Sequence, residues 1–255
     1  MTQLLSIRHK SLAIICSLLI LPISACANKS EEAKKPKASE KPALQTTASP
    51  MKIGVIGAGW LGGTVGKLLV KAGHEVMFSS RHPEELQAMA KELGSRASVG
   101  TPKEAAAFGD VLLFAVPYDA IPQLGIDLKN EINGKIVLDA CNGGSGDLGK
   151  EVDANGNGPT SAKYLAGTKL VRVFSSEDAT AIEASFDRKE NKLAIPIATD
   201  FPDARDVAAQ LVRDAGCEPV IAGNLSTGVK FQRRTPAFRA NTNATELKRL
   251  LDQTK

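Results

Sequence analysis

From residue 51 onward, short apolar runs alternate with segments in which apolar residues recur at helical spacing. The apolar runs cover residues 52–57, 74–80, 110–117, 135–142, 169–176, 193–200 and 217–223. The helical segments cover residues 59–73, 83–94, 177–186 and 201–216. Continuous apolar runs are typical of parallel strands that are covered on both faces. Strands that alternate with helices therefore predict an α/β fold with a doubly wound parallel sheet.

The first fifty residues follow a different pattern. Arg8 and Lys10 precede an apolar stretch of 15 residues, 11–25, which is short for a membrane span and suits the core of a signal peptide. The stretch ends in ISAC, 23–26, which resembles the lipobox of bacterial lipoproteins, where the cysteine is acylated after cleavage. We expect a signal peptide over 1–25 and a lipid anchor on Cys26 that holds the protein at the periplasmic side of a bilayer.

Residues 26–50 are rich in Lys, Glu, Ala, Ser and Pro and hold almost no large apolar residues, so we expect a disordered tether. Two alternatives stay open: an uncleaved N-terminal anchor, or translation from Met51, which gives a cytoplasmic enzyme. The leader also carries all of the excess charge. Residues 1–50 hold seven Lys or Arg and three Glu, and the other 25 basic and 25 acidic residues balance. The charge pattern therefore gives no support for nucleic-acid binding.

A glycine motif follows the apolar run at 52–57. Gly57, Gly59 and Gly62 form G-x-G-x-x-G after a predicted strand and at the start of a predicted helix, which is the context of a Rossmann-type dinucleotide site. The first glycine permits the tight turn, the second lets the backbone approach the pyrophosphate, and the third permits close packing of helix and strand. We expect the cofactor to contact this turn, including Ala58, Trp60 and Leu61. A glycine-rich turn without a ligand is the alternative.

The end of the second predicted strand indicates which dinucleotide binds. NAD-binding proteins usually place Asp or Glu there, whereas this chain has Ser79, Ser80 and Arg81 and no acid before Glu84. Two hydroxyl groups and a guanidinium suit a 2′-phosphate, so the sequence predicts NADP. Arg81 as an ordinary surface charge is the alternative.

Other chemistry has weaker support. The four cysteines show no CxxC spacing and there are three histidines, so we expect no zinc site and no disulfide framework, and we interpret Cys141 and Cys217 as buried apolar residues. DANGNG, 153–158, begins like a calcium-binding loop, but Tyr164 occupies the position that needs Glu, so we expect a flexible glycine-rich turn and no metal. Neither tyrosine is followed by Lys four residues later, as a short-chain dehydrogenase requires.

Five segments carry a family resemblance: MKIGVIGAGWLGGTVG, FSSRHPEEL, LLFAVPYDA, KIVLDACN and FQRRTPAFRAN. The chain from 51 to 255 resembles the NADPH-dependent coenzyme F420 reductase family, the NADP oxidoreductase, coenzyme F420-dependent type. The resemblance implies that Ala115, Val116 and Pro117 lie near the nicotinamide. It also implies that a flavin- or deazaflavin-type acceptor stacks between an NADP-binding core, 51–142, and a C-terminal α/β extension, 143–255.

Two segments depart from that family at the expected acceptor cleft, where this chain has Gly143-Gly144 and Ser175-Ser176. We expect Tyr118, Asn142 and Ser175 to line the cleft. His74 and His82 are expected on the adenosine side, which leaves no protein acid or base beside the acceptor. The sequence thus predicts hydride transfer by positioning, with no catalytic residue. A non-catalytic NADP-binding lipoprotein is the alternative function, and a monomer and a homodimer both stay open.

Overall fold

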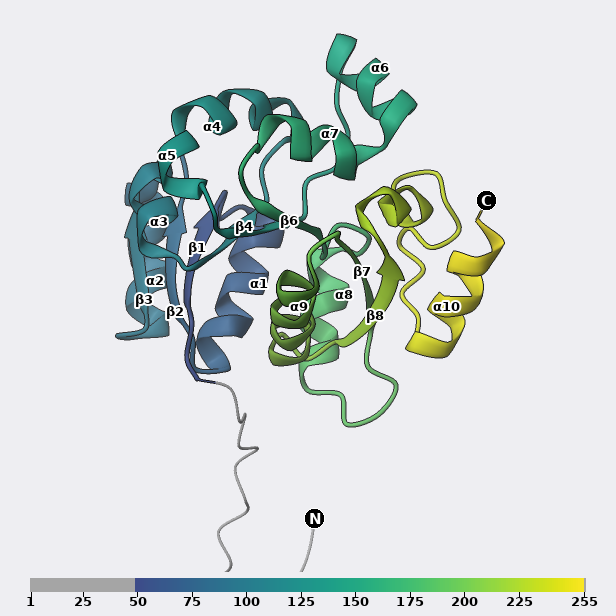
Figure 1. Cartoon of the computed structure of the whole chain (residues 1–255). Coiled ribbons are helices and arrows are strands. Elements are labelled where there is room, and N and C mark those ends of the chain that lie inside the picture. Colours follow the sequence, from purple (N-terminus) through teal and green to yellow (C-terminus); the bar gives the residue numbers. More distant parts are fainter. Residues whose placement is uncertain (1–48, 255) are drawn as a thin grey trace, which may run out of the picture. The chain divides into compact units, whose positions relative to one another are not determined.

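The computed structural model describes residues 49–254; the predicted signal peptide, Cys26 and most of the predicted tether lie outside them. One sheet of eight strands, in the order β3-β2-β1-β4-β5-β6-β7-β8, organises the described residues (Figure 1). The strands are β1 (Lys52–Ile56), β2 (Glu75–Ser79), β3 (Ala97–Gly100), β4 (Val111–Phe114), β5 (Ile136–Asp139), β6 (Lys169–Arg172), β7 (Ala194–Ala198) and β8 (Glu218–Gly223).

The sheet is mixed but mostly parallel. Each neighbouring pair from β3 to β6 is parallel, and so is β7 with β8. The two groups meet where Arg172 at the end of β6 pairs antiparallel with Ala198 at the end of β7. The predicted α/β Rossmann-type fold is confirmed, with this antiparallel junction as an added feature.

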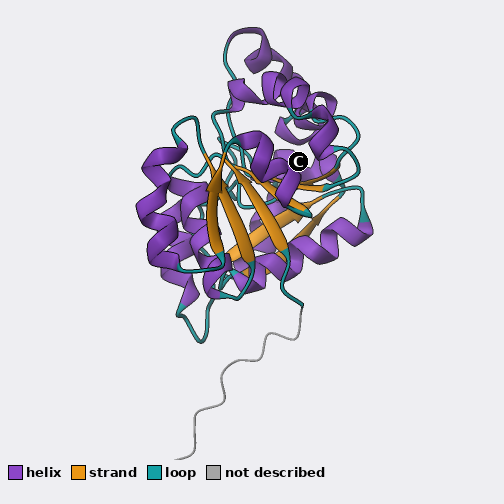
Figure 2. Ribbon diagram, turned by 90° about the vertical axis from the view of Figure 1, so that its left-hand side faces the viewer, coloured by secondary structure: helices purple, strands orange, loops and turns teal. Residues whose placement is uncertain are grey.

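Helices cover both faces of the sheet (Figure 2). They are α1 (Trp60–Lys71), α2 (Gln87–Leu93), α3 (Pro102–Phe108), α4 (Ile121–Asp127), α5 (Lys129–Ile132), α6 (Gly146–Asn155), α7 (Asn157–Tyr164), α8 (Ala179–Phe186), α9 (Pro202–Asp214) and α10 (Ala244–Gln253), with short 3-10 helices η1 (Pro83–Leu86), η2 (Tyr118–Ala120) and η3 (Leu225–Phe231). The sequence runs are continuously apolar because both faces of the sheet are covered, as β4 shows. Val111 and Leu113 join the core under α1, α8 and α9, whereas Leu112 and Phe114 join the core under α3, α4 and α5.

A third, smaller core joins β7 and β8 to α10. The buried members of all three cores lie between Ile53 and Leu251. A chain that begins at Met51 therefore keeps the complete core and is expected to fold without the leader. Within residues 49–254, no helix has the length and apolar character needed to cross a bilayer.

Several elements were not predicted from the sequence: β3, the helices α3 to α7, and α10. Helix α3 has a clear start signal, because the Thr101 hydroxyl accepts from the N–H of Glu104 and the Glu104 carboxylate accepts from the N–H of Thr101. The prediction of a flexible turn at 153–158 is wrong. Those residues end α6 and begin α7, and only Gly156, at φ 84°, makes the turn between the two helices.

Candidate functional site

The glycine motif forms a tight turn at the carboxyl end of β1. The N–H groups of Gly57 and Ala58 both donate to the carbonyl oxygen of Ser79, at 3.2 and 2.7 Å, which draws the turn against the end of β2. Gly57 has φ +96°, and a Cβ there would lie 2.6 Å from the carbonyl oxygen of Ala115. Both the backbone angle and the neighbouring strand therefore require glycine at this position.

The other two glycines of the motif also match their predicted roles. A Cβ on Gly62 would lie 2.2 Å from the carbonyl oxygen of Gly57, so a side chain would push α1 away from the turn. A Cβ on Gly59 would meet nothing within 4 Å, which leaves open space beside the backbone. Helix α1 starts there with no side-chain cap and no acidic residue in its first turn. Its free N–H groups can therefore donate hydrogen bonds to a phosphate.

A cavity of about 500 Å³, the cofactor cavity, opens beside this turn. Its lining joins the carboxyl ends of β1, β2 and β4 and comprises Ile56, Gly57, Ala58, Gly59, Ser80, Arg81, Pro102, Ala115, Val116, Pro117, Asp119, Ala120 and Leu124. Eight of the predicted cofactor residues therefore meet in one place. Trp60, Leu61, Gly62 and Ser79 do not line it, although Trp60 begins α1 with 65% of its surface exposed.

The three residues predicted to hold the 2′-phosphate have different positions. Ser79 is fully buried and its hydroxyl donates to the carbonyl oxygen of Val55 at 2.7 Å, so the predicted contact of Ser79 with the phosphate is wrong. Ser80 accepts from the N–H of His82 at 2.9 Å and lines the cavity. Arg81 is exposed at its rim and forms no ion pair within residues 49–254.

Asn142 and Ser175, both predicted to line the acceptor cleft, meet at the carboxyl ends of β5 and β6. The Asn142 side-chain amide donates to the carbonyl oxygen of Ser175, and its oxygen accepts from Nη2 of Arg172 at 3.0 Å. Arg172 also forms an ion pair with Asp139, 2.8 Å between Nη1 and Oδ2, and neither side chain has any exposed surface. This buried pair fixes Asn142 in position. The sequence analysis missed it, although a charged residue inside an otherwise apolar strand is a visible signal.

Tyr118 does not lie where the sequence analysis expected it. Its side chain is 2% exposed, and its hydroxyl donates to the carbonyl oxygen of Asn157 at 2.8 Å and lies 3.0 Å from Oγ of Ser161. Burial raises the pKa of Tyr118 to about 12. The side chain therefore ties η2 to α7, and it lines neither the cofactor cavity nor the neighbouring cavity described next.

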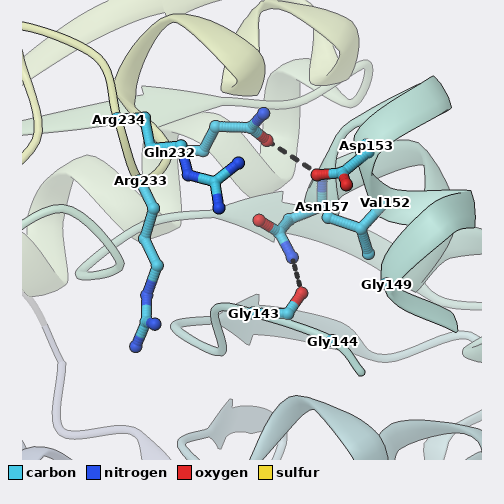
Figure 3. A pocket seen from close by; sticks show the side chains of 9 residues that line it. All are labelled: Gly143, Gly144, Gly149, Val152, Asp153, Asn157, Gln232, Arg233 and Arg234. Atoms are coloured by element: carbon cyan, nitrogen blue, oxygen red, sulfur yellow. Dashed lines mark hydrogen bonds between the residues drawn. The ribbon is translucent and has the colours of Figure 1, made fainter. Parts of the chain in front are cut away.

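A second cavity, of about 190 Å³, lies beside the predicted cleft (Figure 3). We call it the Gly143 cavity. Its lining comprises Gly143, Gly144, Gly149, Val152, Asp153, Asn157, Gln232, Arg233 and Arg234. Asn157 holds its two sides together, because its side-chain amide donates to the carbonyl oxygen of Gly143 at 3.1 Å and its backbone N–H donates to Oε1 of Gln232 at 3.3 Å. The sequence analysis did not place Arg233 or Arg234 at a site.

One carboxylate connects the cofactor cavity to the segment after β5, part of which lines the Gly143 cavity. Asp119 lines the cofactor cavity, and its oxygens accept from the backbone N–H and the hydroxyl of Ser145 at 2.8 and 2.9 Å. The glycine-rich segment 143–146 is thereby held between the cofactor cavity and the Gly143 cavity. Both cavities consequently belong to the same edge of the sheet.

Two titratable groups near β6 and β2 complete the description. Glu177 follows Ser175 and Ser176, and burial raises its pKa to about 7 while its Oε1 accepts from the N–H of Asn241.

His74 lies at the opposite end of the sheet, at the start of β2, where it contacts Asp214 at 3.0 Å. The expected place of His74 on the adenosine side is therefore wrong, whereas His82 does lie beside Ser80. Cys141 and Cys217 are buried free thiols, as predicted.

Known proteins match this arrangement. Residues 52–143 match the family described as NADP oxidoreductase, coenzyme F420-dependent. This stretch is similar to NADP oxidoreductases of that type. It contains the glycine turn, Ser80, Arg81 and the loop at 115–117. The match confirms the predicted family resemblance, the predicted class of NADP-dependent oxidoreductases and the predicted cofactor NADP.

Individual relatives agree with the family match. The chain is 27% identical over 203 residues to an F420-dependent NADP reductase of Methanothermobacter thermautotrophicus, a match that covers 73% of this chain and 87% of the reductase. It is 24% identical to a metalloreductase of Rattus norvegicus, over 75% of this chain and 38% of that protein. A hypothetical protein of Sinorhizobium meliloti has the same fold, with a TM-score of 0.66 and 24% identity over 77% of this chain and 96% of its own.

Proposed function

We propose that the protein transfers a hydride between NADP(H) and a flavin- or deazaflavin-type acceptor. The observation that carries this proposal is the cofactor cavity, which joins the glycine turn, Ser80 with Arg81, and the loop at 115–117. We further propose that 51–142 form the cofactor-binding part and that 143–255 complete the acceptor cleft. NADP(H), when bound, supplies the hydride; the residues of this chain bind and align the two partners.

The residues of the cavity fit NADP. Space beside Gly59 lets a pyrophosphate approach the free N–H groups of α1. Arg81 and Ser80 offer a guanidinium and a hydroxyl to a 2′-phosphate, and no acidic residue of β2's carboxyl end repels it. Apolar groups of Ala115, Val116 and Pro117 line the remaining length and exclude water from the reacting ring.

The acceptor assignment is supported by what the cavities lack within the described residues. Neither cavity is lined by a histidine, lysine or tyrosine, and the Asp119 carboxylate in the cofactor cavity already accepts two hydrogen bonds from Ser145. A flavin-type ring can take a hydride into its conjugated system and a proton from solvent, so alignment is sufficient. The name of one relative, an F420-dependent NADP reductase, pairs NADP with coenzyme F420, whereas the name of another relative is metalloreductase.

The acceptor's polar end is expected in the Gly143 cavity. At about 190 Å³ this cavity is smaller than the ~300 Å³ at which small-molecule sites begin, so it suits one end of an acceptor rather than a whole ring system. Arg233 and Arg234 give it positive charge beside Asp153 (Figure 3). A phosphate or carboxylate on the acceptor would bind there.

A fluorescence titration followed by an acceptor screen tests the proposal. Trp60 is the single tryptophan and begins α1, so its emission reports binding at the glycine turn. NADPH is expected to change that emission at lower concentration than NADH. The NADPH-loaded protein is then mixed with riboflavin, FMN, a deazaflavin and a panel of ketones. Faster turnover of ketones than of any flavin would refute the acceptor class, and binding without any turnover would favour the non-catalytic NADP-binding lipoprotein.

We also propose that the protein is a lipoprotein anchored through Cys26. The support is the charged start, the short apolar core and ISAC in the sequence. Mass analysis of the native N-terminus is expected to find an acylated Cys26, and Cys26→Ala is expected to remove the protein from detergent-soluble membrane fractions. A native chain that starts at Met51 in the cytoplasm would exclude the anchor.

A further inference from the structure

A third cavity, of about 810 Å³, lies at the other end of the sheet. We call it the amino-edge cavity, because its segments directly precede strands: the α1–β2 turn, Arg96 before β3, the α8–β7 loop and the end of α9 before β8. Parallel strands place their amino ends at one edge and their carboxyl ends at the other. In this cavity the α1–β2 turn and Arg96 lie at the amino ends of β2 and β3, whereas the cofactor cavity lies at the carboxyl ends of the parallel strands β1, β2 and β4. The length of these strands therefore separates the two linings.

Positive charge dominates this cavity. Its lining contains six basic residues, Lys71, Arg96, Arg188, Lys189, Lys192 and Arg213, and two acidic residues, Asp187 and Asp214. Asp214 is already engaged, because its oxygens accept from Nε2 of Gln210 at 2.9 Å and contact Nε2 of His74 at 3.0 Å. Within residues 49–254, none of the six cations forms an ion pair with a carboxylate.

The concentration of charge is local. Residues 51–255 hold 25 basic and 25 acidic residues, so the folded part as a whole is neutral. Some of the six cations are partly held by the chain itself: Nζ of Lys192 donates to the carbonyl oxygen of Gly216, and Lys71 lies over the ring of Phe186. Arg96 and Arg213 are exposed. An accumulation of unpaired cations around a cavity attracts anions.

The chain enters the fold at the same edge. The N–H of Met51 donates to Nδ1 of His74 at 3.1 Å, and His74 contacts Asp214 in the lining of the cavity. Met51 precedes β1, whose amino end therefore lies beside the cavity. Met51, the first residue after the predicted tether, is thus close to the cluster of cations.

We propose that the amino-edge cavity docks on the phosphate headgroups of an anionic membrane surface. Clusters of Lys and Arg next to an anchor bind anionic lipid through charge. This step rests on the proposed lipid anchor at Cys26, which would hold the chain at the same bilayer and raise the local concentration of headgroups, so that weak binding by this surface is sufficient. Docking at this edge turns the cofactor cavity, at the opposite edge, away from the membrane and toward soluble partners.

Vesicle binding by the chain 51–255, which keeps the complete core, tests this docking without a lipid anchor. The vesicles are phosphatidylcholine alone, or phosphatidylcholine with one third phosphatidylglycerol. We expect the chain to bind only the vesicles that contain phosphatidylglycerol, and we expect added salt to weaken this binding. Arg96→Gln with Arg213→Gln is expected to lower that binding by about tenfold or more. The matched control, Lys129→Gln with Lys248→Gln, removes two exposed charges that line none of the three cavities and is expected to bind as the unmodified chain does.

Affinity for NADPH is measured on the same variants and is expected to stay unchanged, which separates this proposal from the proposed function. Equal binding to both kinds of vesicle, or equal losses in both double variants, would overturn the docking. A third arm offers inorganic phosphate and pyrophosphate. Tight binding of these ions by a chain that ignores the vesicles would assign the cavity to a soluble phosphate ligand and overturn the membrane proposal.

Discussion

The cofactor cavity and the Gly143 cavity lie at the same edge of the sheet but are assembled in different ways. The first is formed mainly by short segments that directly follow β1, β2 and β4. The second combines the loop after β5 with α6, α7 and the segment after η3, so Asn157 must meet Gln232 across 75 positions of the chain. Each part of the cofactor site thus carries a local sequence signal at the end of a strand, whereas the acceptor side depends on contacts between distant segments.

The buried pair of Arg172 and Asp139 joins the carboxyl ends of β5 and β6, just before the segment that lines the Gly143 cavity, and its removal is expected to have the largest effect. Arg172→Met leaves the Asp139 carboxylate buried without its partner, which costs about 3–5 kcal/mol of unfolding free energy. Urea unfolding measures the loss. Addition of Asp139→Leu to Arg172→Met is expected to recover much of it, because the unpaired charge is gone.

Arg249→Met is the control for that experiment, since it breaks an exposed pair with Glu246. A small change is expected there, as for surface ion pairs generally. If Arg172→Met lost as little unfolding free energy as Arg249→Met, the pair would not hold the carboxyl ends of β5 and β6 together. Asn142, which accepts from Arg172, would then owe its position to Ser175 alone.

The same contrast explains what the sequence could predict. The G-x-G-x-x-G turn, the strands from β1 to β8 other than β3, and the loop at 115–117 carry their signals in consecutive residues, and the structure brings them together. Ser79 was misplaced because alternation along β2 decides which of two adjacent serines faces the cavity, and this depends on where the strand ends. One residue of shift exchanges the two faces.

The acceptor side was harder to predict. Tyr118 follows the predicted loop directly, but its side chain turns toward α7, a helix that the sequence analysis did not predict. Arg233 and Arg234 lie in a segment that carries the family resemblance, but nothing local in that segment places them at a cavity, because the other side of the cavity is far away in sequence. Long-range packing rather than local propensity places these residues, and a single sequence does not contain that information in readable form.

On the cofactor side, the test is the difference in affinity between NADPH and NADH, which differ by the 2′-phosphate. A hydrogen bond to a charged group contributes about 1.5–3 kcal/mol. Arg81→Ala is therefore expected to weaken NADPH binding by about ten- to a hundredfold and to leave NADH almost unchanged, as measured by Trp60 fluorescence. Ser79→Ala is the control: its hydroxyl donates to Val55, so selectivity is expected to stay the same. Equal losses for both cofactors in Arg81→Ala would show that Arg81 supports the fold instead.

The preference for a phosphate-bearing acceptor over an uncharged one tests whether the Gly143 cavity binds the acceptor. FMN and riboflavin share a ring system and differ by one phosphate, so their ratio of kcat/KM isolates the contribution of that charge. Arg233→Gln with Arg234→Gln is expected to lower the ratio by about tenfold, the equivalent of one charge-assisted hydrogen bond. Lys150→Gln, on the exposed side of α6, is the control and is expected to leave the ratio unchanged. An unchanged ratio in the arginine variant would exclude this cavity from acceptor binding.

Two glycines of one motif are expected to respond differently to alanine. In Gly62→Ala the new Cβ meets the carbonyl oxygen of Gly57, and such overpacking costs about 1–3 kcal/mol of unfolding free energy. In Gly59→Ala the Cβ meets no protein atom, so stability is expected to stay near that of the original chain while NADPH affinity falls. Urea unfolding and Trp60 fluorescence measure the two effects. Loss of stability in both variants would mean that Gly59 also serves packing rather than cofactor approach.

The smallest expected effect concerns Tyr118, the predicted cleft residue that packs in the core. Tyr118→Phe removes the hydroxyl contacts with Asn157 and Ser161, at a cost of about 0.5–1.5 kcal/mol of unfolding free energy at neutral pH. Because burial raises the pKa of Tyr118 to about 12, above its unfolded value of about 10, the buried neutral phenol contributes stability below pH 10 that is lost as the pH rises toward 12. The variant is expected to lack that alkaline loss and to keep most hydride-transfer turnover. Tyr164→Phe, which removes a contact with Glu151, is the control for a lost tyrosine hydroxyl. A Tyr118→Phe protein that is stable but inactive would return this side chain to the reaction and refute hydride transfer by alignment alone.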